Sequence, residues 1–567
     1  MRIAIKRAPQ VGGEVEAQDR PKGVSTRLPA RARAGGALRR YTTRWGPATL
    51  AILGGALVLW LIAGVGFVNY DTLYALVWGQ QITRGETPEY GLPIAPTPHP
   101  LIEVLGIPLA PLGASAESTI VVALAFLALS ACGWVIYRLG EAWFGRAAGI
   151  VAALVFLTRV PVLSYGVRAY VDVPYTLLVL SALLVETRHR RAGAPVLVLL
   201  GLAGLLRPEA WVFSGIYWVL LVVASERSRA QAALGASAPV GPAMDPAVGP
   251  AMDPAVEPAM DPAVEPAVEP AINPAVEPAQ DPARSRRDLA RLALLAAAAP
   301  LFWIASDLAV TGNAMWSLTN TKHTAATLGR ATGIGDVPQY IPRRIGEILR
   351  PAVLAGAAFG GVLSLLWLRD KARLGAIAGV VAVLVFALMA TFGLPIDTRY
   401  AFLASAILCL FCGAGAFGWI ALAKDDRRRT PWMVAGSLVL VALLATLPGQ
   451  IKSAHKELSN LAHQESIQSD LLALVKSKAV SPTCGPVGVP NHAPVPLLAL
   501  YLKSRPGLVV SAEAKQIQAG TYVDPASLEV ERDYILDPKD PHAAVSIPPG
   551  FTATQSNRSW LIFQKCA

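Results

Sequence analysis

Two ionisable residues interrupt one of the longest apolar stretches of this 567-residue chain. Residues 195–224 are predominantly apolar, but they contain Arg207-Pro208-Glu209. Charged side chains at membrane depth are costly, and they usually face a water-filled cavity with a functional role. A guanidinium binds phosphate well, and a carboxylate can accept a proton. The alternative is an internal Arg207–Glu209 pair that only closes a turn.

The composition indicates a membrane protein. Hydrophobic residues make up 53% of the chain and charged residues 16%, and the mean hydropathy is +0.45. Soluble proteins contain about 25% charged residues, so an ordinary cytosolic enzyme is excluded. The hydrophobicity also excludes disorder over most of the chain. Five cysteines are too few for a disulfide scaffold.

The basic residues indicate how the chain is oriented. The net charge is +11, and residues 1–46 alone hold eleven Lys and Arg against three acidic residues. We interpret this segment as a disordered cytosolic arm. Nucleic-acid binding is the alternative, but Tyr41 and Trp45 are the only aromatic residues among these arginines. No nucleic-acid partner is therefore expected.

Apolar segments of spanning length predict a polytopic α-helical membrane protein with about eleven transmembrane helices. Short basic loops at 138–146, 188–191, 369–373 and 424–429 all lie on the cytosolic side only if 195–224 crosses twice, as a hairpin. Its first limb, 195–206, is too short to span alone. The predicted spans are 48–68, 118–137, 147–166, 169–187, the two limbs of 195–224, 292–310, 351–368, 374–394, 400–423 and 431–448.

The segments between the spans divide the chain into five parts. Residues 242–283 repeat a Pro-Ala-x-acid tetrad, which forbids regular helix and predicts an extended linker, with a partner-binding tether as the alternative. The tail contains an amphipathic stretch at 450–478, a helix-like 493–503 and strand-like runs at 486–489, 507–511 and 560–564, which predict a small external α/β domain. The parts are the arm 1–46, a core 47–224 with the first external loop, the linker 225–290, the remaining helices 291–448 with an external loop 311–350, and the external domain 449–567.

Several motifs lie on the predicted outer side. They are Asn69-Tyr70-Asp71 with Tyr74, the step Pro98-His99-Pro100-Leu101, Tyr170-Val171-Asp172-Val173-Pro174, Leu206 to Trp211, Asp307 to Gly312 with Trp316-Ser317-Leu318, and Asp397-Thr398-Arg399-Tyr400. Together they resemble the GT-C glycosyltransferases, multi-span enzymes that take sugar from a polyprenyl-phosphate carrier on the outer face of the membrane. The resemblance covers roughly 45–450. A lone Asp71 where many members carry paired acids, and Thr97-Pro98-His99-Pro100 where a basic residue often stands, depart from the family.

The resemblance implies an enzyme and assigns roles to these residues. Asp71 is the expected catalytic base, with its pKa raised from about 3.9 towards neutrality in a partly dry cavity. Asp172 is the second catalytic carboxylate. Substrate and phosphate binding fall to His99, Arg207, Glu209, Arg399 and Lys322, with Arg330, Arg343 and Arg344 in reserve.

Structural roles are the alternatives to these assignments. Asp71 and Asp172 would then be helix caps, Arg399 a headgroup anchor, His99 plain loop structure, and the basic residues of 311–350 contacts to anionic lipid. The rival function is a non-enzymatic membrane protein, either a transporter of lipid-linked saccharide or a degenerate family member. Transporters often show internal symmetry, and none is found here.

No cofactor or metal site is expected. Gly413 to Gly418 matches the dinucleotide fingerprint but lies inside a predicted span, and the seven histidines form no ligand motif, although a divalent cation at the carboxylates stays open. Cys484 and Cys566 are predicted to form a disulfide in an external compartment. The expected partners are a polyprenyl-phosphate sugar donor, an unidentified glycan, lipid or protein acceptor, and membrane lipids. The expected location is the plasma (inner) membrane, with the N-terminus cytosolic and the tail external.

Overall fold

The computed structural model describes residues 46–236, 284–535 and 547–566. The predicted basic arm and the Pro-Ala-x-acid repeat lie outside these described residues. The chain divides into two units at 51/52, and the spatial relations given below concern the described residues from 52 onwards.

Every predicted apolar span overlaps at least one helix of the structure, but fewer helices have spanning length than predicted. Eight described helices are long and apolar enough to cross a membrane, or nine if α6 and α7, bent by 65°, form one span. The prediction of about eleven counted 147–166 as unbroken and also counted α8 and α9, which are shorter. The long helices and their partners are α2 (Gly46–Ala63), α5 (Ala114–Phe144), α6 (Arg146–Leu157), α7 (Val160–Val167), α8 (Asp172–Arg188), α9 (Ala194–Gly204), α10 (Glu209–Ala236), α11 (Arg286–Thr311), α13 (Val337–Trp367), α14 (Arg369–Thr391), α15 (Phe402–Phe417) and α16 (Arg429–Lys476).

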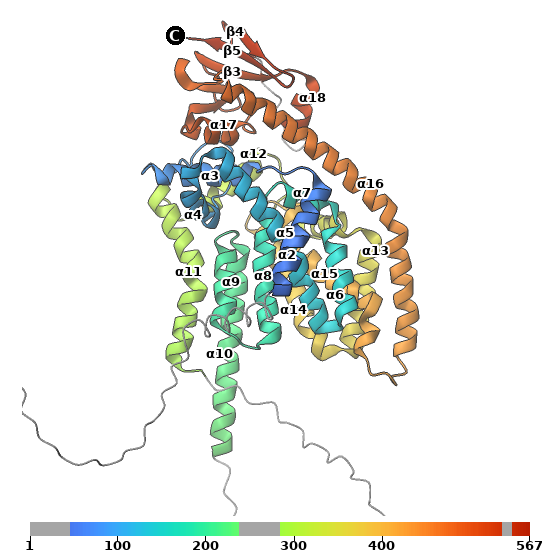
Figure 1. Cartoon of the computed structure of the whole chain (residues 1–567). Coiled ribbons are helices and arrows are strands. Elements are labelled where there is room, and N and C mark those ends of the chain that lie inside the picture. The colour runs from blue at the N-terminus through green and yellow to red at the C-terminus, as the bar shows by residue number, and fades with distance from the viewer. Residues whose placement is uncertain (1–45, 237–283, 536–546, 567) are drawn as a thin grey trace, which may run out of the picture. The chain divides into compact units, whose positions relative to one another are not determined.

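The connections between helices separate into two ends of the bundle. The α5–α6, α8–α9, α13–α14 and α15–α16 connections, which carry the basic loops, lie at the end away from the C-terminal sheet (Figure 1). The stretch 195–224 forms the two limbs α9 and α10, which pack against each other, with Arg207 in the connection between them. The opposite end, called the sheet end below, holds α3 (Tyr70–Thr83), α4 (Pro100–Leu109) and α12 (Trp316–Thr327) (Figure 1).

The C-terminal part is a small mixed α/β unit, as predicted. Its strands are β1 (Val487–Val489), β2 (Val509–Ser511), β3 (Gly520–Pro525), β4 (Thr552–Ser556) and β5 (Trp560–Lys565). They form one sheet in the order β2-β1-β3-β5-β4, in which β1 pairs in parallel with β2 and β3, and β5 pairs antiparallel with β3 and β4. Three of these strands overlap the predicted runs, whereas β3 and β4 were not predicted. The helix α17 (Val495–Leu502) matches the predicted helix.

The helix α16 joins the bundle to the sheet without a break. It is 48 residues long, so it continues through the boundary at 448/449 that the sequence suggested, with Pro448 inside it. One apolar cluster then joins α3 to this unit and includes Tyr74, Trp78, Leu471 and Trp560. The two cysteines predicted to pair, Cys484 and Cys566, are bonded in the structure, with their Cα atoms 5.0 Å apart.

Close contact between α13 and α15 depends on glycine. A methyl group added at Gly360 would meet the backbone of Phe411 and Gly415, whereas one added at the neighbouring Gly361 would only touch the Phe411 ring at 3.9 Å. Backbone atoms cannot move aside as a flexible side chain can, so the helices would have to separate.

We therefore expect Gly360→Ala to destabilise the protein by about 1–3 kcal/mol. Alanine favours helix by up to about 1 kcal/mol over glycine, so Gly361→Ala should be neutral or slightly stabilising. Thermal unfolding of the purified variants in detergent measures both. Equal midpoints for the two variants would contradict the close packing.

Candidate functional site

A cavity of about 1410 Å³ lies at the sheet end and is lined by both the helical bundle and the C-terminal unit. Apolar side chains such as Phe67, Leu318 and Phe392 share its walls with charged ones. Contacts from α12 to the first loop, including Asn320 Nδ2 to the Ala95 carbonyl at 3.2 Å, close one side. The charged and histidine side chains of the lining are Asp71, His99, Arg168, Arg207, Glu209, Asp307, Arg330, Asp397, Arg399, His463, His492, Glu529, Arg532 and Asp533.

Asp71 lies in the first turn of α3 and faces an arginine from far along the chain. Asn69 supplies the N-cap, because its side chain accepts from the backbone N–H groups of Asp71 and Thr72. The Asp71 carboxylate instead forms an ion pair with Arg399, whose Nη1 is 2.5 Å from Asp71 Oδ2. Arg399 comes from the short turn Thr398–Ala401 before α15. The side chain of Asp71 is therefore not the cap of this helix.

Arg207 holds two further carboxylates. It forms ion pairs with Asp172, the first residue of α8, and with Glu209, the first residue of α10, where Nε lies 3.2 Å from Oε1. All three side chains are at least nine-tenths buried. The Arg207 guanidinium also lies 3.8 Å from the centre of the Tyr400 ring. The pair within 207–209 thus exists, but it belongs to a larger group.

Arg399 connects the two sets of charges. Its Nη1 lies 4.0 Å from Asp172 Oδ2, an oxygen that is buried and accepts no hydrogen bond among the described residues. The result is a chain of alternating charges, called the ionic network below, made of three carboxylates and two guanidiniums. Its members are Asp71, Arg399, Asp172, Arg207 and Glu209.

The pKa of Asp71 is lowered, which corrects the expectation of a raised value. Burial by itself raises the pKa of this carboxyl group, but the charge and hydrogen bond of Arg399, with contributions from His99 and Arg330, outweigh burial. The sequence indicated that Asp71 is shielded from water, but it could not show that Arg399 lies beside this carboxylate. In this state Asp71 is an ionised partner of Arg399 at neutral pH and a weak base.

His99 links the first loop to the helical hairpin. It precedes α4, its side chain lines the cavity, and its Nδ1 donates to the Leu206 carbonyl at 2.8 Å. Burial lowers the pKa of His99, so the ring is neutral at pH 7. This geometry leaves Nε2 as an acceptor.

The arginines and the lysine of 311–350 are not all brought to the site. Lys322 is exposed on α12, lies beside Gly393 and does not line the cavity. Arg330 does line it and pairs with Asp397 at 3.1 Å. Arg343 and Arg344 instead form ion pairs with Glu347.

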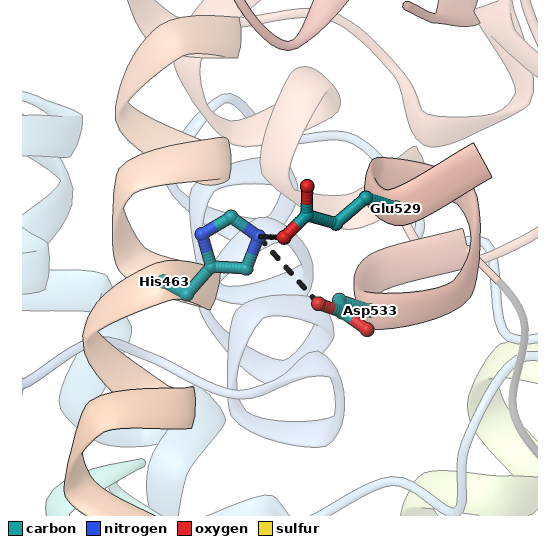
Figure 2. A group of neighbouring side chains, drawn as sticks. All are labelled: His463, Glu529 and Asp533. Carbon is teal, nitrogen blue, oxygen red and sulfur yellow. Dashed lines mark ion pairs between the residues drawn. The ribbon is translucent and has the colours of Figure 1, made fainter. Parts of the chain in front are cut away.

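Sequence reasoning missed the part of the cavity wall that the C-terminal unit supplies. His492 lies against the Tyr70 ring, with its Nδ1 3.0 Å from Glu513 Oε2. His463, Glu529 and Asp533 form a group in which one potential ligand atom from each lies within 4.8 Å of the others (Figure 2). The three residues form no motif in the sequence, because His463 lies more than 60 positions before Glu529 and Asp533.

Comparisons with known proteins leave the function to be argued from this site. No family model matches the chain, and no curated protein matches it. Among solved structures it is similar to the archaeal oligosaccharyltransferase AglB from Archaeoglobus fulgidus, in complex with an inhibitory peptide and a dolichol-phosphate. The identity is 11%, the TM-score is 0.43, and the match covers 87% of this chain and 70% of that one.

The ionic network predicts a large effect of Arg207 on stability. Arg207→Gln would leave Asp172 and Glu209 buried without their cation, and loss of one partner of a buried pair costs about 3–5 kcal/mol. Thermal unfolding in detergent should therefore show a clear loss for Arg207→Gln. Arg427→Gln, an exposed arginine in the α15–α16 connection, should match the wild type. Equal stability of all three proteins would show that Arg207 does not hold the network.

Proposed function

We propose that the protein is a membrane glycosyltransferase that moves a sugar from a polyprenyl-phosphate carrier to an acceptor hydroxyl. The observation that carries this proposal is the ionic network, of which Asp71, Arg399, Arg207 and Glu209 line a large, partly apolar cavity and Asp172 lies buried behind it. A lipid-linked sugar phosphate needs such a combination of guanidiniums, carboxylates and apolar walls.

The two arginines suit the phosphate of the donor. Arg399 lies 5.2 Å from the Tyr170 ring centre and 5.3 Å from that of Tyr400, so aromatic faces hold its guanidinium in place. Planar, positioned guanidiniums bind phosphate through paired hydrogen bonds and stabilise it as it leaves. In this proposal Arg399 and Arg207 bind the departing polyprenyl phosphate.

Donor binding would also activate the base. A phosphate that takes hydrogen bonds from Arg399 weakens its pair with Asp71, and the burial of Asp71 then acts to raise the pKa. Asp71 accepts the proton of the acceptor hydroxyl, whose oxygen forms the new bond to the anomeric carbon. The bond from that carbon to the phosphate oxygen breaks, and the phosphate keeps the electron pair. This single displacement inverts the anomeric centre. Asp172 orients the acceptor or shares the base role.

The arrangement of the loops supports an external active site in the plasma membrane. The basic connections lie at the end of the bundle opposite the cavity, and basic loops stay in the cytosol. In this proposal the sheet end faces outwards. The remaining walls of the cavity select the hexose or pentose, the acceptor and the linkage.

Transfer with defined donors tests the proposal. Purified protein is supplied with a panel of radiolabelled polyprenyl-phosphate sugars and a membrane extract as acceptor source. Asp71→Asn and Asp172→Asn should lower transfer by at least about 100-fold, because each removes a carboxylate of the site. Asp425→Asn, exposed in the α15–α16 connection, should keep full activity. No transfer with any donor, together with measured flipping of a lipid-linked saccharide, would favour the transporter instead.

The pH dependence of transfer tests the role of Arg399. In the folded free enzyme Arg399 holds the pKa of Asp71 down, so Asp71 stays ionised until the pH is low. In Arg399→Gln only His99 and Arg330 still oppose the effect of burial, so the pKa of Asp71 rises and the acid limb of kcat/KM moves to higher pH. We also expect kcat/KM to fall by about 10- to 1000-fold, because phosphate stabilisation is lost. An unchanged acid limb in this variant would show that Asp71 is not the group whose protonation lowers kcat/KM at low pH. Arg427→Gln is the control and should leave the pH profile unchanged.

A further inference from the structure

A second group of potential ligands lies in the cavity wall that the C-terminal unit supplies. His463 comes from α16, Glu529 from α18 (Leu528–Val530), and Asp533 from the helical turn that follows, Glu531–Ile535. His463 Nε2 is 3.9 Å from Glu529 Oε1 and 3.5 Å from Asp533 Oδ2. Both carboxylates approach the same edge of the imidazole (Figure 2). All three residues line the cavity.

The imidazole nitrogen that faces these carboxylates is unsatisfied. His463 Nε2 is shielded from solvent and has no hydrogen-bond partner among the described residues, although the side chain as a whole is 29% exposed. A buried nitrogen without a partner is costly and calls for an explanation. An ion held between the nitrogen and the two carboxylates would satisfy all three groups.

Hydrogen bonds between side chains and backbone hold these segments independently of the ligand atoms. The residue after the histidine, Gln464, donates from Nε2 to the Asp533 carbonyl at 2.9 Å. Ser527 caps the short turn that carries Glu529, accepting from the Val530 N–H at 3.3 Å. The ligand set is therefore brought together by the fold and does not need an ion to assemble it.

We propose that His463, Glu529 and Asp533 bind one divalent transition-metal ion of the Zn²⁺ or Mn²⁺ class. An imidazole nitrogen with carboxylate oxygens suits these ions, whereas Mg²⁺ and Ca²⁺ prefer oxygen ligands alone. Ligand atoms around tetrahedral Zn²⁺ lie about 3.4 Å apart. The separation of 3.5 Å already fits, and Glu529, whose side chain is 67% exposed, is free to close the separation of 3.9 Å.

Arg532 is the group that competes with the ion. Its Nε lies 2.8 Å from Asp533 Oδ1, and Nη2 lies 3.4 Å from Oδ2. The Arg532 side chain is 71% exposed, so it can turn into solvent when an ion takes the carboxylate. Its positive charge must weaken the binding of a cation, and removing it should strengthen binding.

The ion would give the cavity a second kind of binding group. Three protein ligands leave at least one coordination position open. Because the three residues line the cavity, this position is available to a hydroxyl or anionic group of a molecule bound there. The proposed metal site is inferred from the geometry of these residues alone. It does not depend on the proposed glycosyl transfer.

Direct metal binding by the full chain tests the site. The protein is purified without a polyhistidine tag, stripped with EDTA and titrated with Zn²⁺ and with Mn²⁺ by calorimetry, with Ca²⁺ as the comparison. We expect one equivalent of Zn²⁺ or Mn²⁺, tighter than Ca²⁺. Affinity should fall at least about tenfold in His463→Gln and in Asp533→Asn. His455→Gln, an exposed histidine two turns earlier on α16, is the matched control and should bind as the wild type does.

Further variants keep the outcome decisive. Arg532→Gln should bind the ion more tightly than the wild type, a result that a purely structural pairing of these side chains would not give. If His463→Gln lowers the unfolding temperature, its loss of metal affinity could come from misfolding. Glu529→Gln changes an exposed side chain, so a loss of metal affinity in this variant supports the site. No metal bound by the wild type, or equal affinity in the wild type, His463→Gln and Asp533→Asn, would overturn the site.

Discussion

The cost of burying charge at the end of an apolar bundle is the constraint on which the site depends. The carboxylates of Asp71, Asp172 and Glu209 and the guanidiniums of Arg399 and Arg207 offset one another's cost of burial. Four segments that are distant in sequence must therefore meet for any of them to be stable. Three carboxylates against two arginines leave one excess negative charge, so a bound phosphate has to displace a carboxylate from an arginine.

This constraint explains the irregular helices. The helix α8 begins at Asp172, and α9 ends at Gly204, just before Arg207. With 17 and 11 residues, they are shorter than the eight helices of spanning length. The start of α8 and the connection after α9 bring Asp172 and Arg207 into contact, so both helix ends serve the network. The same connection brings Arg207 against Glu209, the first residue of α10. The helix α10, which begins at Glu209, is long enough to span, and α16 extends into the C-terminal unit.

Sequence alone could indicate the residues of the network because a charge in an apolar stretch is conspicuous. The same reasoning failed for Lys322, because a lysine in a polar segment costs nothing and its type therefore constrains little. The direction of the pKa shift of Asp71 could not be predicted, since it depends on Arg399, a residue 328 positions away. The predicted helices and three of the strands follow from local patterns, whereas the group at His463 arises only from tertiary contacts.

The position of the donor phosphate is the most direct measurement of whether the network serves lipid-linked sugar chemistry. A cryo-electron microscopy structure of the protein in nanodiscs with a polyprenyl phosphate would show it. We predict that the phosphate lies in the cavity between Arg399 and Arg207, with the Asp71–Arg399 contact lengthened from 2.5 Å and the lipid chain against the apolar walls. A polyprenyl phosphate bound elsewhere, with the ionic network intact and the cavity empty, would contradict a glycosyl-transfer site there.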